Sequence, residues 1–154
     1  MNKLKALLVN LKAKKLTVAA AESCSGGYLS YLLTKIPGSS KVFQGGIVVY
    51  SLKAKNKFFK IPPFLLKKTK GVSAQIAETL AKGVRKMLAT DIGLSIVGFA
   101  GPKGVNIGLV YITIADKTGA SSKKFIIKGT RDIVRKKASL LAINLLYKRL
   151  NSKH

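Results

Sequence analysis

Apolar residues recur along this chain at two spacings, every three to four positions in some segments and as short unbroken runs in others. Four leucines at helical spacing, with lysines between them, predict an amphipathic helix over residues 3–13. A second apolar face at that spacing predicts a helix from Ala74 to about Leu88, with Ser73 as its N-cap. Further helices are predicted over 28–35, over 51–59 with Ser51 as the cap, and over 132–150.

The unbroken apolar runs predict buried strands over 17–21, 44–50 and 92–99. Segments 108–115 and 123–127 are predicted to form a hairpin joined by the turn at 116–119. Pro62 and Pro63 end the preceding helix, and residues 64–71 are interpreted as a lysine-rich connection. Helices alternating with strands, followed by a hairpin, predict a three-layer α/β/α sandwich with a mixed β-sheet. No linker or repeat divides residues 1–154, so we expect a single domain.

Composition limits the class of protein. The chain has 154 residues, 47% of them hydrophobic, which suffices for a continuous core. Its longest apolar runs, 92–100 and 107–115, fall far short of the roughly 20 residues that span a membrane. Lysines interrupt any signal-peptide core near the N-terminus. Cys24 is the only cysteine, which excludes an internal disulfide and predicts a cytoplasmic location.

The charge is strongly positive, with 29 basic against 5 acidic residues and a formal net charge of +24. Such a surface attracts anions, and nucleic acid is one candidate partner. However, 25 of the basic residues are lysines scattered over nearly every segment, whereas base-reading proteins rely on arginine and on clustered patches. We therefore favour an ordinary surface biased towards lysine, and a basic nucleic-acid-binding module stays open as an alternative.

The rarest residues exclude several chemistries. His154 is the only histidine and the last residue, which argues against Ser-His-Asp and Cys-His arrangements. Five scattered carboxylates without a useful histidine argue against zinc and two-metal sites. No Walker phosphate loop occurs. A serine nucleophile would therefore need a lysine, or Tyr50, as its base.

The turn at 22–27, read as ESCSGG, directly follows the first predicted strand and precedes a helix. This layout exposes hydroxyl groups at the carboxyl end of a strand and offers the unpaired N–H groups of a helix start to an anion. Amides of residues 25–27 are candidate oxyanion or phosphate donors. Glu22 is expected to anchor the turn through backbone N–H groups. Since neighbouring residues of a strand point in opposite directions, Cys24 is interpreted as buried packing rather than as a second nucleophile.

Lys55 is the candidate base because the segment 50–55 follows the second strand, where a parallel neighbour of the first strand would end. Its side chain would then rise beside the turn at the same edge of the sheet. A lysine acts as a base only when burial or positive neighbours lower its pKa. The alternative is an ordinary solvated lysine on a helix.

These segments together resemble the C-terminal domain of the competence-damage-inducible protein (CinA) family, which includes stand-alone nicotinamide-nucleotide amidohydrolases. The central match is 21–27, AESCSGG, against the family signature AESCTGG. Further matches follow in order over nearly the whole chain, at 37–40, 45–51 with Lys55, 71–73, 98–102, 108–110 and Arg131.

The resemblance implies hydrolysis of the carboxamide of nicotinamide mononucleotide to nicotinic acid mononucleotide and ammonia. It assigns the nucleophile to Ser23 and the base to Lys55, with Ser25 and Tyr50 assisting. It implies no cofactor and no metal, and an anionic nucleotide as the small-molecule partner. We also expect a homo-oligomer of unspecified size. The substrate-binding residues that the resemblance suggests are Glu22, Gly26, Gly27, Gly45, Gly98, Ala100, Gly101 and Arg131.

The sequence departs from the family pattern in two places. Val97 stands where a threonine or serine is usual, and residues 103–107 replace a longer, glycine-rich acidic loop. The nucleotide-processing domain that precedes this domain in longer family members has no counterpart in the sequence. A catalytically silent domain that binds a nucleotide or another phosphate ligand therefore stays open as a second alternative.

Overall fold

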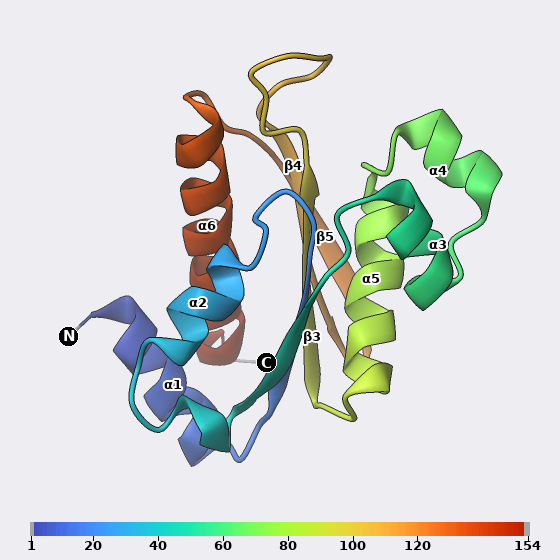
Figure 1. The fold of residues 1–154 in the computed structure, drawn as a ribbon. Helices are drawn as coiled ribbons and strands as arrows, with labels where there is room; N and C mark the ends of the chain where they lie inside the picture. The colour runs from blue at the N-terminus through green and yellow to red at the C-terminus, as the bar shows by residue number, and fades with distance from the viewer. Residues whose placement is uncertain (1, 153–154) are drawn as a thin grey trace.

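A five-stranded mixed sheet lies between two layers of helices in the computed structural model, which describes residues 2–152 (Figure 1). The strand order is β2-β1-β3-β4-β5. β1 runs parallel to β2 and β3, whereas β4 runs antiparallel to β3 and to β5. The strands are β1 (Val18–Glu22), β2 (Phe43–Val48), β3 (Ile92–Gly98), β4 (Leu109–Asp116) and β5 (Gly119–Ile126).

The helices divide between the two faces of the sheet. One face carries α1 (Lys3–Ala13), α2 (Tyr28–Thr34) and α6 (Arg131–Asn151), and the other carries α3 (Leu52–Phe59), α4 (Pro63–Thr69) and α5 (Ala74–Met87) (Figure 1). A short 3-10 helix, Ser39–Lys41, precedes β2. The predicted three-layer α/β/α sandwich in a single domain is confirmed.

The interior strand β1 lets helices pack on both faces of the sheet. All five of its residues are buried, and three of them are alanines. Ala20 contributes to the core beneath α1, α2 and α6, while Ala19 and Ala21 contribute to the core beneath α5. Small side chains let both layers approach the sheet, because helix-to-sheet packing tolerates little bulk in the middle.

The register of the parallel strands creates one functional edge. Glu22 at the end of β1 pairs with Val48 of β2 on one side and with Ile96 of β3 on the other. The segments that follow these three strands therefore leave the sheet at the same edge, as α/β folds require of a ligand site. The turn after β1 and the start of α3 after β2 are brought together there.

Two local predictions were wrong. Residues 64–71 were expected as a connection, but Pro63–Thr69 forms α4, because Pro63 occupies the first turn of the helix, where its missing N–H costs nothing. The second hairpin strand starts at Gly119 instead of residue 123, since the polar segment 120–122 forms the exposed edge of the sheet. Within residues 2–152, no helix is long and apolar enough to cross a membrane. His154 lies outside the described residues.

Candidate active site

The structure brings Ser23 and Lys55 into direct contact. Lys55 Nζ donates a hydrogen bond to Ser23 Oγ over 2.9 Å. Both side chains are buried: Ser23 is 5% exposed and Lys55 only 2%. Two polar side chains that approach so closely in a buried place form a defined pair rather than a chance surface contact.

The start of α3 positions the lysine. Ser51 caps the helix by accepting from Ala54 N over 3.0 Å, and Lys55 then follows one helical turn after the cap. Lys55 Nζ donates a second hydrogen bond to the main-chain oxygen of Tyr50 over 3.2 Å. Gly71 leaves room beside the amine, since a Cβ there would stand 3.4 Å from Nζ. The two hydrogen bonds hold the amine between Ser23 Oγ and the Tyr50 oxygen.

Burial changes the acidity of this lysine. It lowers the pKa of Lys55 from 10.5 to about 8, because the charged ammonium loses its hydration. A cavity opens in front of Lys55, and none of the residues that line it carries a carboxylate that would restore the charged form of the lysine. A substantial fraction of Lys55 is therefore neutral in mildly alkaline solution, and a neutral amine can accept the proton of Ser23.

Glu22 anchors the turn that carries Ser23, as the sequence suggested. Its carboxylate is fully buried and accepts five hydrogen bonds of 2.6–3.1 Å. The donors are the amides of Gly27, Leu29 and Ser30 and the hydroxyls of Ser25 and Ser30. The carboxylate thus occupies the start of α2, where an anion was expected to bind, so Glu22 supports the site and does not face the substrate.

The same hydrogen bonds change the roles that were expected for Ser25, Gly26 and Gly27. The hydroxyl of Ser25 donates to Glu22 and is fully buried, so it does not face the cavity. The amides of Gly26 and Gly27 are also occupied, by the Ser23 oxygen and by Glu22. Among the described residues, the amides of Cys24 and Ser25 bond no acceptor from another residue. These two amides are the donors that the turn leaves for an oxyanion.

Cys24 packs in the core on the side of α6, as predicted, although it also touches the cavity. The thiol is 4% exposed, and burial raises its pKa to about 11. A thiolate is the reactive form of cysteine, and almost none is present near neutral pH. Cys24 is therefore a poor rival to Ser23.

Tyr50 lies at the mouth of the site and is bonded to Arg131. The guanidinium donates to Tyr50 Oη over 2.7 Å and to the main-chain oxygen of Gly101 over 2.5 Å. Arg131 begins α6, and Gly101 lies in the β3–β4 connection, so this arginine joins three segments at one edge. The tyrosine side chain is 58% exposed, and its hydroxyl is not bonded to the Ser23–Lys55 pair.

A cavity of about 370 Å³ opens in front of Ser23 and Lys55. Seven of the expected residues line it: Ser23, Tyr50, Lys55, Gly98, Ala100, Gly101 and Arg131. Five others were expected at the site and do not line the cavity: Glu22, Ser25, Gly26, Gly27 and Gly45. Gly45 pairs with Ala19 inside the sheet, too far from the carboxyl end of β1 to reach the opening.

Two lysines of the cavity were missed by the sequence analysis. Lys70 and Lys103 both line it. Their position in the sequence could have identified them, because Lys70 directly precedes the family motif at 71–73 and Lys103 directly follows the motif at 98–102. Of the two departures from the family pattern, Val97 is fully buried in the core and does not line the cavity, whereas the short loop contributes Lys103.

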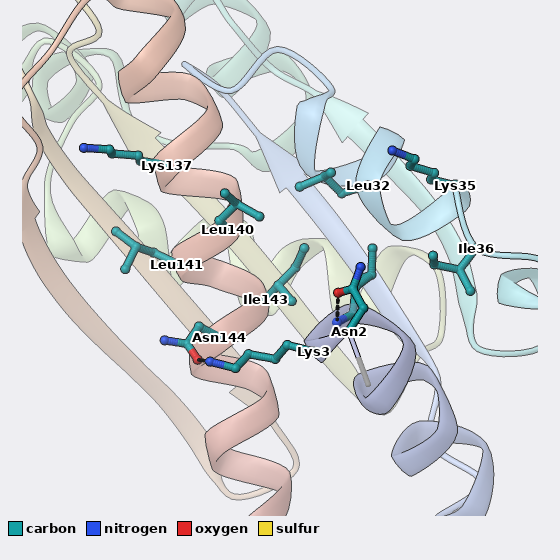
Figure 2. Close-up of a pocket in the computed structure, with 11 residues that line it drawn as sticks. Asn2, Lys3, Leu32, Lys35, Ile36, Lys137, Leu140, Leu141, Ile143 and Asn144 are labelled. Carbon is teal, nitrogen blue, oxygen red and sulfur yellow. Dashed lines mark hydrogen bonds between the residues drawn. The ribbon is translucent and has the colours of Figure 1, made fainter.

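Two larger hollows, of about 540 and 500 Å³, lie elsewhere and contain neither Ser23 nor Lys55. Figure 2 shows the larger one, where Leu32, Ile36 and Leu140 stand among lysines and Lys3 donates to Asn144. In the part of the chain that the structure describes, His, Cys, Asp and Glu side chains nowhere form a group of three that could hold a metal ion.

Fold and geometry together define an α/β domain with a hydrogen-bonded serine–lysine pair at the carboxyl edge of its parallel strands. The chain belongs to the CinA C-terminal domain family, whose family model matches residues 2–150. It is 39% identical over 148 residues to a CinA-like protein of Dictyoglomus turgidum, covering 93% of this chain and 36% of that protein. A CinA-like protein of Geobacter sulfurreducens is 37% identical over 143 residues, covering 90% and 35%. The chain thus spans about a third of the length of these relatives.

Solved structures agree with the fold. A competence or damage-inducible protein from Enterobacter asburiae superposes with a TM-score of 0.92 at 27% identity, covering 97% of this chain and 96% of that one. The competence/damage inducible protein CihA from Agrobacterium tumefaciens gives a TM-score of 0.90 at 27% identity, covering 97% and 94%. Near-complete coverage of both chains means that the similar structures share the whole domain rather than a fragment.

Proposed function

We propose that this domain hydrolyses the carboxamide of nicotinamide mononucleotide, releasing nicotinic acid mononucleotide and ammonia, with Ser23 as nucleophile and Lys55 as base. The observation that carries the proposal is the buried 2.9 Å contact between Lys55 Nζ and Ser23 Oγ, with the lysine pKa lowered to about 8. The resemblance to the amidohydrolases of the family supplies the substrate. The contact supports the roles of Ser23 as nucleophile and Lys55 as base.

In the first half-reaction, Ser23 Oγ attacks the amide carbon while neutral Lys55 takes the hydroxyl proton. The developing oxyanion is stabilised by the amides of Cys24 and Ser25, which bond no other residue. The C–N bond then breaks, Lys55 returns the proton to the departing nitrogen, and ammonia leaves. An ester between the acyl group and Ser23 remains.

In the second half-reaction, a water molecule attacks the ester carbon and Lys55 accepts one of its protons. The bond to Ser23 Oγ breaks, and Lys55 gives the proton back to the serine. The hydrogen bond from Lys55 to the Tyr50 carbonyl matters in both steps. Once the amine is neutral, it keeps one N–H on that carbonyl while its lone pair replaces the N–H that Lys55 donates to Ser23 Oγ.

A silent phosphate-binding domain is the second candidate, and the replaced loop 103–107 favours it, because Lys103 of this loop lines the cavity. A single assay separates the two. Purified protein is incubated with nicotinamide mononucleotide at pH 8, and ammonia and nicotinic acid mononucleotide are measured together. Equal amounts of both products, absent with Ser23→Ala, support the hydrolase. Binding of the mononucleotide without either product supports the silent domain.

A further inference from the structure

A hollow of about 540 Å³ lies among the helices α1, α2 and α6 (Figure 2). We call it the helix groove, and its walls include Lys3, Leu32, Lys35, Lys137, Leu140 and Asn144. It shares no lining residue with the cavity in front of Ser23 and Lys55. Its volume falls within the range of pockets that hold small ligands, about 300–1,000 Å³. The proposed reaction gives this groove no role.

The floor of the helix groove is apolar. Leu4, Leu32 and Ile143 form its buried part, each at most 8% exposed. Leu140 of α6 lines the same groove but is 54% exposed. An apolar side chain left half exposed in a concave surface is stabilised when an apolar ligand removes it from water. The floor therefore favours a ligand with an apolar body.

Lysines surround this apolar floor. Lys3 comes from α1, Lys35 directly follows α2, and Lys137 comes from α6. None of the described residues that line the groove is acidic. The ion pairs within residues 2–152 involve other cations, so neither Lys35 nor Lys137 has a carboxylate partner. Charge complementarity therefore adds an anionic group to the apolar body of the ligand.

The groove is closed where α1 meets α6. Lys3 Nζ donates to Asn144 Oδ1 over 2.8 Å and joins the two helices there (Figure 2). Along α6 the walls extend from residue 137 to residue 144, about 10 Å at 1.5 Å per residue. An extended chain of about eight carbon atoms has this length, at roughly 1.2 Å per bond. A peptide added as a strand would need a free sheet edge, which three helices do not offer.

We propose that the helix groove binds a small anionic amphiphile, a carboxylate that carries an unbranched chain of about eight carbon atoms. The chain covers Leu140 and the buried floor, and the carboxylate meets the unpaired lysines Lys35 and Lys137. The inference does not depend on the proposed reaction, because no residue of the groove belongs to the Ser23–Lys55 site.

Titration with octanoate, followed in ¹H–¹⁵N spectra of the labelled protein, tests the proposal residue by residue. At about 150 mM salt, screening beyond roughly 8 Å suppresses general attraction to the positive surface. We expect saturable shifts of the amides of residues 32–36 and 137–144, and none at residues 22–27. Uncharged 1-octanol should bind about tenfold or more weakly, and acetate, which lacks the chain, should give no saturable shifts.

One matched pair of variants tests the apolar contact. Leu140→Gln should weaken octanoate binding by about threefold or more, because the chain loses its exposed apolar partner. Val9→Gln removes an equally exposed side chain, 55% against 54%, from α1 outside the groove and should leave binding unchanged. Both positions are exposed, so neither substitution should disturb the fold.

A second pair tests the charge. Lys35→Gln combined with Lys137→Gln should weaken octanoate binding by about tenfold. Lys5→Gln combined with Lys12→Gln removes the same charge from exposed positions of α1 outside the groove and should have no effect. Equal losses in groove and control variants, or shifts scattered over the surface without saturation, would overturn the inference. An acidic amphipathic peptide that binds more tightly than octanoate would also overturn it, by assigning the groove to a protein partner.

Discussion

Lys55 Nζ and Ser23 Oγ lie 2.9 Å apart although 32 residues separate them in the sequence. Two parallel strands account for the meeting, because β1 ends one residue before Ser23 and β2 ends shortly before the helix that carries Lys55. The contact therefore depends on the register of the sheet and on the cap of α3, and not on any feature of the two residues alone.

Replacing the base should abolish most of the activity. Lys55→Met keeps the length of the stem but cannot accept a proton, so kcat for ammonia release should fall by about a thousandfold, within the usual contribution of general base catalysis. Lys53→Met and Lys57→Met remove the same charge from exposed positions of α3 and serve as controls. Similar losses in all three variants would mean that general electrostatics, and not a serine–lysine pair, supports turnover.

The rate should depend on pH through one group. The folded-state pKa of Lys55 is about 8, and the neutral form is the base. From pH 6 to pH 8 kcat/KM should therefore rise by about tenfold per unit, and it should level off above pH 8. A profile of initial rates between pH 6 and 10 measures this. A flat profile over that range would exclude Lys55 as the proton acceptor.

The lysine should also weaken the fold that holds it. Burial lowers its pKa from 10.5 to about 8, so a charged Lys55 costs stability below pH 8. Lys55→Met should raise the free energy of unfolding at pH 7 by about 1–3 kcal/mol, because removing the buried charge gains more than the loss of its two hydrogen bonds costs.

That gain should shrink as the pH rises. Between about pH 8 and 10.5 the folded wild type has released the proton while the unfolded chain still holds it, so wild-type stability rises with pH by up to about 1.4 kcal/mol per unit. Urea unfolding of both proteins at pH 7 and pH 9.5 measures the difference. A destabilised Lys55→Met protein at pH 7, or a gain that grows with pH, would contradict the assigned burial cost.

Strand and helix patterns predicted the layers and placed the segment after β2 at the same edge as the turn that carries Ser23. They left open whether Lys55 is a base or a solvated lysine, and only the family resemblance paired it with Ser23. The sequence was least informative for residues whose role depends on which other residue they hydrogen-bond. Ser25 looked like an assisting hydroxyl because it belongs to the motif, yet its bond to Glu22 turns it away from the cavity. Lys70 and Lys103 differ from the other lysines in the sequence only by their position next to family motifs, and the folded cavity brings them together.

The Glu22 anchor should be essential to the turn. Glu22→Gln replaces an acceptor oxygen with an amide that faces donors, so some of the five hydrogen bonds must break in a fully buried place. We expect a loss of about 2–4 kcal/mol in the free energy of unfolding, measured by denaturant titration. Glu78→Gln on α5, which is only half-buried, is the matched control and should change stability by less than about 0.5 kcal/mol. Equal effects would mean that the carboxylate does not hold the turn.

The covalent intermediate on Ser23 is the central claim, and rapid-quench mass spectrometry tests it most directly. Protein mixed with nicotinamide mononucleotide is stopped in acid within the first turnover, digested with trypsin, and the peptide covering residues 16–35 is fragmented. The account predicts an acyl adduct on Ser23 that forms in wild-type and Cys24→Ala protein and is absent from Ser23→Ala protein, which releases no ammonia although it stays folded. An adduct on Cys24, or turnover by Ser23→Ala near the wild-type rate, would contradict it.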